Sequence, residues 1–176
     1  TIGSLIESLT TDPRPLFAVG SSGIEYALTA HWNPIESAES PPAFGSVDQL
    51  LIVTGSCSPV TQRQNQAALE HGFAEIPIAT DRLLDNETSA AEITHSFELA
   101  LQMLRAGHNV ILHTAMGPED ERIHTTNELF HRLGYTGIDA QLRSGRLLGP
   151  KLGQILKNTL TEFPLHRIGI AGGDTS

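Results

Sequence analysis

The chain is organised around its last segment, Arg167-Ile-Gly-Ile-Ala171-Gly-Gly-Asp-Thr-Ser176. A short apolar run leads into two glycines, and three small side chains that carry oxygen follow them. This composition is typical of a strand-to-helix turn that wraps backbone N–H groups around an anion. A helix normally follows such a turn and brings partial positive charge to it. We therefore expect a phosphate-binding element here, and we expect the 176 residues to be a piece of a longer protein that is cut inside this element.

The same alternation of strand and helix signals runs through the rest of the chain. The segments predicted as strands are residues 16–19, 49–54, 74–79, 109–114 and a last run from 166. The segments predicted as helices are residues 2–9, 23–33, 59–71, 90–106, 126–133 and 147–163. This order predicts an α/β fold, a three-layer α/β/α sandwich with a mainly parallel, doubly wound sheet. The strand residues expected to be buried are Leu51, Val53, Val110, Leu112, Ile168 and Ile170.

Local signals predict where several helices begin. Ser58 is expected to be the N-cap of a helix, because Pro59 suits the first helical position, where its missing N–H is not needed. Ser89-Ala-Ala-Glu92 has the pattern of a capping box, in which the serine and the glutamate bond to each other's backbone N–H. Residues 81–88 are predicted to be a polar connection without regular structure.

Composition excludes several function classes. The net charge is −9, with only 11 lysines and arginines, so nucleic acid is not an expected partner. A single cysteine excludes a disulfide framework within the chain and favours a reducing compartment. No apolar run approaches the roughly 20 residues that span a bilayer. We therefore expect a globular cytoplasmic protein with no membrane partner.

Four small turns are expected at one edge of the sheet. They are residues 20–23, 55–58, 115–117 and 172–175, and each directly follows a predicted strand. Parallel sheets bind ligands at the carboxyl ends of their strands. Turns between strands and helices are often rich in glycine and serine for steric reasons alone. The four turns taken together, however, favour the binding of an anion by backbone N–H and hydroxyl groups.

Three motifs resemble one known family. They are residues 20–28, residues 53–64 with Gly-Ser-Cys-Ser-Pro-Val-Thr, and residues 170–176 with Gly-Gly-Asp-Thr-Ser. In this order they are similar to the C-terminal half of the four-carbon acid sugar kinases, which phosphorylate threonate, erythronate or 3-oxo-tetronate with ATP. The resemblance implies that residues 1–176 are an incomplete C-terminal nucleotide-binding domain of a two-domain kinase, with an internal loop or linker at 34–46.

The same resemblance implies a binding site and its ligands. The residues that it places against ATP are Ser56, Ser58, Gly172, Gly173, Asp174 and Thr175. Asp174 is expected either to hold the Mg²⁺ that accompanies ATP or to cap the following helix. The sugar acid and the catalytic residues would belong to an N-terminal lobe whose acidic motif is absent from this sequence. The chain alone is therefore expected to have little or no kinase activity. The resemblance does not fix the oligomeric state and allows a homo-oligomer.

Several individual residues allow other interpretations. Cys57 lies at a strand-to-helix turn, so it is either a nucleophile of a hydrolase or phosphatase, with His113 as a possible partner, or a small buried thiol. Glu119-Asp-Glu121 is expected to complement a helix dipole, not to bind metal. His108, His124 and His131 are expected to be solvated. A third reading is a non-catalytic binding module, since members of the family have carried a type III effector label.

Overall fold

The computed structural model describes residues 1–9, 22–32 and 45–172, in two compact units, Thr1–Gly45 and Ser46–Ser176. Its helices are α1 (Ile2–Ser8), α2 (Ser22–Trp32), α3 (Pro59–Glu70), α4 (Thr80–Leu84), α5 (Ser89–Arg105), α6 (Glu121–Arg132) and α7 (Gly137–Glu162). Its strands are β1 (Leu51–Thr54), β2 (Ala74–Pro77), β3 (Val110–His113) and β4 (Ile168–Ala171). In the described ranges no helix is long and apolar enough to cross a membrane.

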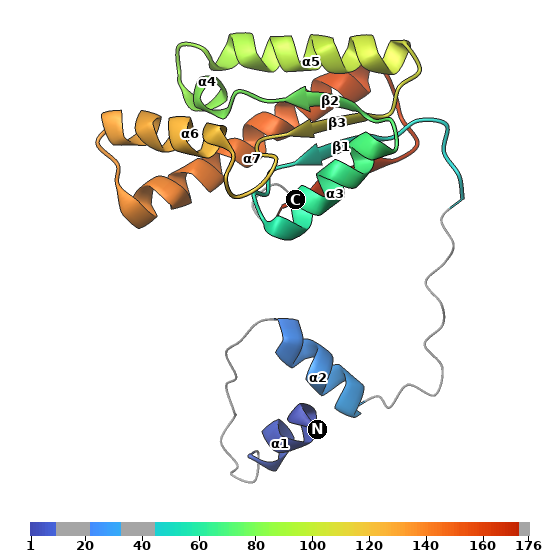
Figure 1. The fold of residues 1–176 in the computed structure, drawn as a ribbon, viewed down its shortest axis with the longest axis vertical. Helices are drawn as coiled ribbons and strands as arrows, with labels where there is room; N and C mark the ends of the chain where they lie inside the picture. The colour runs from blue at the N-terminus through green and yellow to red at the C-terminus, as the bar shows by residue number, and fades with distance from the viewer. Residues whose placement is uncertain (10–21, 33–44, 173–176) are drawn as a thin grey trace. The chain divides into compact units, whose positions relative to one another are not determined.

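The four strands form one parallel sheet in the order β2-β3-β1-β4. Strand β1 lies inside the sheet, where Leu51 pairs with Val110 of β3 on one side and with Ile168 of β4 on the other. Helix α5 packs on β2, β3 and α7, and Figure 1 shows α3 in front of the sheet and α7 behind it. The predicted parallel α/β fold is therefore confirmed, while the strand predicted at 16–19 lies outside the described residues.

The core forms where the apolar strand faces meet α5 and α7. Four of the six strand residues predicted to be buried are buried: Leu51, Val53, Val110 and Leu112. Ile168 is half-buried, and Ile170 is 43% exposed, so the prediction for Ile170 is wrong. Strand β4 is at the edge of the four-stranded sheet and pairs with β1 alone, which explains why its side chains are less covered.

Three helices differ from the sequence-based expectation. Helix α4 begins at Thr80 and otherwise lies in the segment 81–88 predicted to be an irregular connection, and it forms there because Leu83 and Leu84 are buried. Helix α6 begins at Glu121, five residues before the predicted start, because Asp120 caps it. Helix α7 begins ten residues before the predicted start and continues through Pro150.

The capping box predicted at Ser89 and Glu92 is wrong. Helix α5 begins at Ser89 itself, and the preceding Thr88 makes no side-chain capping bond. Ser89 Oγ instead accepts a hydrogen bond from Lys151 Nζ at 2.5 Å. The Glu92 carboxylate accepts one from the backbone N–H of Ala79 at 3.1 Å. Both side chains therefore join α5 to other elements and do not close its first turn.

The N-terminal unit is a pair of helices, α1 and α2. They approach closely at Gly3, where an added Cβ would lie 2.3 Å from the carbonyl oxygen of Ala27. A hydrogen bond of 2.5 Å joins His31 Nε2 and Glu7 Oε2 between the two helices. Glycine is therefore required at position 3 for this helix pair.

Candidate functional site

The turns that follow β1 and β4 begin side by side. Thr54 pairs with Ala171 in parallel register, and the backbone N–H of Gly55 donates to the carbonyl oxygen of Ala171 at 2.9 Å. The next residue, Gly172, has a φ of +128°, a conformation that favours glycine. Because parallel strands end at the same edge, the turn at 55–58 and Gly172 lie together at that edge.

The predicted site residues fall on these two turns as far as the structure describes them. Ser56 and Ser58 lie on the turn after β1, and Gly172 directly follows β4. Gly173, Asp174 and Thr175 lie outside the described residues, and their role as ATP contacts stays a prediction.

The hydroxyl groups of the first turn fix its shape. Ser58 is the N-cap of α3, as predicted, and its Oγ accepts from the backbone N–H of Thr61 at 3.1 Å. Ser56 Oγ accepts from the Ser58 backbone N–H at 3.2 Å and from Thr61 Oγ1 at 2.9 Å. The turn is thus locked onto the N-terminus of α3, which carries the positive end of the helix dipole.

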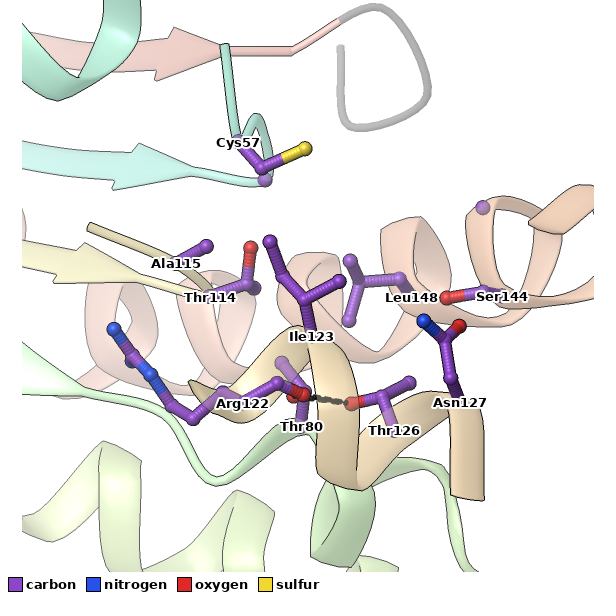
Figure 2. Close-up of a pocket in the computed structure, with 12 residues that line it drawn as sticks. Cys57, Thr80, Thr114, Ala115, Arg122, Ile123, Thr126, Asn127, Ser144 and Leu148 are labelled. Atoms are coloured by element: carbon purple, nitrogen blue, oxygen red, sulfur yellow. Dashed lines mark hydrogen bonds between the residues drawn. The ribbon is translucent and has the colours of Figure 1, made fainter. Parts of the chain in front are cut away.

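A cavity of about 300 Å³ adjoins this turn. It lies between the carboxyl ends of β1 and β3 and the helices α4, α6 and α7 (Figure 2). Its lining residues are Gly55, Cys57, Thr80, Thr114, Ala115, Arg122, Ile123, Thr126, Asn127, Ser144, Gly145 and Leu148. Since Gly55 and Cys57 belong both to the turn and to the cavity wall, the two features form one continuous site.

Arg122 lines the cavity, and all five of its N–H donors are used within the protein. Nε and Nη2 donate to the Asp120 carboxylate at 2.9 and 2.6 Å. Nη1 donates to the carbonyl oxygens of Ile78 and His113 at 3.3 and 2.9 Å. Nη2 also lies 3.1 Å from His113 Nδ1. Arg122 therefore holds together the ends of β2 and β3 and the start of α6.

Asp120 completes this group at the start of α6. Its carboxylate accepts from the backbone N–H groups of Arg122 at 2.9 Å and Met116 at 2.7 Å. The hydrogen bond from Arg122 holds the pKa of this carboxyl far below its usual range, and the two backbone donors contribute in the same direction. Asp120 is therefore an ionised helix cap, in agreement with the dipole-complementing role predicted for the acidic run.

His113 is neutral in this arrangement. Its Nε2 lies 2.8 Å from Glu75 Oε1, and its Nδ1 faces the Arg122 guanidinium, which can only donate. Nδ1 must therefore accept, so Nε2 carries the proton. Burial lowers the pKa of His113, and the nearby Arg122 charge lowers it further, against the opposing effect of the Glu75 carboxylate.

Cys57 differs from the buried thiol that its size suggested. Its side chain is exposed, and Figure 2 shows it on the wall of the cavity next to the end of β1. Both ring nitrogens of His113 are occupied by Glu75 and Arg122. The histidine considered as a partner for Cys57 is therefore not available as a general base.

Two polar side chains on the opposite wall of the cavity make no hydrogen bond to the described part of the protein. Asn127 of α6 and Ser144 of α7 line the cavity, and neither side chain has a hydrogen-bond partner within the described part of the protein. By contrast, Thr80 and Thr126 on the same wall bond to each other at 2.6 Å. Asn127 and Ser144 therefore keep their hydrogen-bonding capacity for a ligand.

Sequence reasoning did not identify Arg122, Asn127 or Ser144. The last two lie on different helices, and Ser144 falls in the first part of α7, which was not predicted as helix. The only local signal was the position of Arg122 two residues after a capping aspartate. His108, His124 and His131 are exposed, as predicted. Over residues 1–9, 22–32 and 45–172, no group of three or more His, Cys, Asp or Glu side chains could hold a metal ion.

One family of known proteins matches more than half of the chain. The model of one family, described as a nucleotide-binding C-terminal domain, matches residues 51–176. A 3-oxo-isoapionate kinase of Paraburkholderia graminis is 36% identical over 164 residues, which are 92% of this chain and 34% of that protein. A D-threonate kinase of Salmonella typhimurium is 24% identical over 170 residues, which are 97% of this chain and 37% of that protein.

The chain spans about a third of the length of these curated relatives. No solved structure matches the chain at a significant level. The matched segment begins with β1 and includes both turns of the site and every lining residue of the cavity. The chain belongs to the family of nucleotide-binding C-terminal domains, and the resemblance to the C-terminal domain of the four-carbon acid sugar kinases is confirmed.

Proposed function

We propose that this domain is the ATP-binding lobe of a kinase that phosphorylates four-carbon acid sugars of the threonate, erythronate or 3-oxo-tetronate type. The observation that carries the proposal is the adjacency of the carboxyl ends of β1 and β4, joined by the bond from Gly55 to Ala171. The names of the two relatives, a 3-oxo-isoapionate kinase and a D-threonate kinase, support the class of reaction and substrate.

The two turns suit the phosphates of ATP for physical reasons. Phosphoryl transfer depends mainly on positioning the phosphates and on neutralising their charge. A net charge of −9 leaves few free cations on this chain, so backbone N–H groups must do much of this work. Gly55, whose own N–H bonds to Ala171, and Gly172 leave room for a phosphate oxygen to come close to the backbone of the turn because no Cβ intervenes. The N-terminus of α3 adds a favourable dipole.

Mg²⁺ enters the proposal with the nucleotide. Asp174 is the residue of the Gly172–Ser176 motif that can ligate it, directly or through water. The alternative role of Asp174 is to cap a following helix. The sugar acid would be held by the other lobe of the kinase.

Titration calorimetry with ATP and Mg²⁺ on the Gly173→Val variant tests the proposal. A branched side chain should keep the backbone from approaching the phosphates, and we expect the affinity for ATP to fall at least about tenfold, or about 1.4 kcal/mol. Gly153→Val is the matched control, because a Cβ at Gly153 of α7 meets nothing within 4 Å. Unchanged ATP affinity in a folded Gly173→Val protein would contradict the assignment.

A cysteine-dependent hydrolase or phosphatase is the second candidate, because Cys57 is exposed on the cavity wall. A nucleophilic cysteine is normally activated by a base or a cation beside it. His113 is occupied, and the donors of Arg122 are all used. The bonds that already engage His113 and Arg122 therefore favour the kinase lobe over this alternative.

A further inference from the structure

The wall of the cavity formed by α6 and α7 carries no free charge. Arg122 is the only charged side chain among the lining residues, and its positive charge is balanced by Asp120 at 2.6 Å. Its five donors already have acceptors in the protein, so a ligand phosphate could bind Arg122 only by breaking these bonds. This wall therefore suits an uncharged part of a ligand, while an anionic part belongs at the turn after β1, beside the N-terminus of α3.

The polar groups of this wall are few and lie together. Figure 2 shows the amide of Asn127 pointing toward the hydroxyl of Ser144, with Leu148 beside them and Ile123 between them and Cys57. The apolar side chains of Ile123 and Leu148 offer a surface on which a flat ring can pack. The wall thus combines an apolar surface with one free amide, which supplies a donor and an acceptor side by side.

This combination matches the base of a purine nucleotide, and it distinguishes between the two common purines. Adenine presents the N6 donor and the N7 acceptor at one edge, and an asparagine amide pairs with both. Guanine presents two acceptors, O6 and N7, at the same edge. An amide can satisfy only one of these two acceptors with its donor group, and its own oxygen would face the other.

We propose that Asn127 is the specificity-determining residue of this site and that it selects adenine over guanine, with the base lying against Ile123 and Leu148. The proposal rests on the proposed function, since it requires that a nucleotide binds in this cavity. It adds the direction in which the nucleotide lies, with the phosphates at Gly55 and the base between α6 and α7.

The test is to measure the affinities of the protein for ATP and GTP, each with Mg²⁺, by titration calorimetry. We expect the wild-type protein to prefer ATP. In Asn127→Ala the affinity for ATP should fall about tenfold, which corresponds to about 1.4 kcal/mol, while the affinity for GTP changes little. The ratio of the two affinities should therefore approach one. Asn86→Ala is the matched control, because Asn86 is exposed and does not line the cavity, and it should leave both affinities unchanged.

The possible results separate this proposal from the proposed function. If Asn127→Ala lowers both affinities by the same factor, or neither, Asn127 does not read the base, and the proposal is overturned while ATP binding stands. If the wild-type protein prefers GTP, the proposal is also overturned. If the wild-type protein binds neither nucleotide, the proposed function fails together with the inference that rests on it.

Discussion

Replacing Arg122 with methionine removes the side chain that joins β2, β3 and α6. Methionine is unbranched and of similar length, so it keeps much of the packing and deletes the charge and five donors. It leaves the Asp120 carboxylate without its cation and leaves the carbonyl oxygens of Ile78 and His113 without this donor. The change therefore removes one or more donors from each of several acceptors at once.

The expected loss in the free energy of unfolding depends on how deeply the Arg122–Asp120 ion pair is buried. Removing one partner of a buried ion pair costs about 3–5 kcal/mol. The side chains of Arg122 and Asp120 are 19% and 11% exposed, and Asp120 keeps two backbone donors, so the lower end applies. We expect the free energy of unfolding to fall by about 3 kcal/mol. Arg122→Lys keeps the charge without the planar fork, so it should give an intermediate loss.

Urea denaturation followed by circular dichroism measures this loss. The slope of the unfolding free energy with urea should stay the same while the midpoint falls. Arg132→Met is the control, since Arg132 is an exposed arginine in the last turn of the same helix, and its loss should stay below about 1 kcal/mol. A stability of Arg122→Met equal to that of Arg132→Met would refute the role given to this network.

Two further predictions concern His113 and Cys57. Burial lowers the pKa of His113, so as the pH falls the histidine takes up a proton in the unfolded chain before it does so in the folded one. The contribution of neutral His113 to the free energy of unfolding is therefore full above the pKa of about 6.5 in the unfolded chain. It is lost as the pH falls from there through the lower pKa of the folded state. His113→Asn keeps an acceptor for Arg122 but does not titrate, so the free energy of unfolding of this variant should depend less on pH between about 7 and 5. Urea denaturation at several pH values measures this dependence, and a dependence equal to that of the wild-type protein would contradict the prediction. Cys57→Ser should leave the affinity for ATP within about twofold, and ATP should slow alkylation of Cys57 by iodoacetamide, measured by mass spectrometry. Equal alkylation rates with and without saturating ATP would place the nucleotide away from this wall.

The strands and the edge at which the site lies could be predicted, because they depend on local patterns. Residues 49–54 and 109–114 are apolar runs that end in small turns, and such runs form buried parallel strands in most contexts. The cap at Ser58 was equally local, since Pro59 follows it directly. The sequence therefore placed the turn after β1 correctly, down to the residue that caps α3.

The remaining features depend on residues that meet only in the folded chain. Ser89 and Glu92 have the spacing of a capping box, but in the folded chain Ser89 bonds to Lys151 and Glu92 bonds to the backbone N–H of Ala79 instead. No local pattern reports such distant partners. The bonds from Arg122 to Ile78 and His113 are of the same kind, as is the approach of α6 and α7 that shapes the cavity.

The pairing of β1 with β4 also has a consequence for the order of folding. Leu51 pairs with Ile168, which lies far along the sequence, so closing this contact requires a large loss of chain entropy. The pairing of β1 with β3 spans a shorter loop and is expected to form first. A nucleotide that touches both turns would bind only the state in which β4 has docked, and it would stabilise that state by mass action. Hydrogen exchange at the Gly55 amide, which donates to Ala171, would therefore report β4 docking and slow when ATP is added.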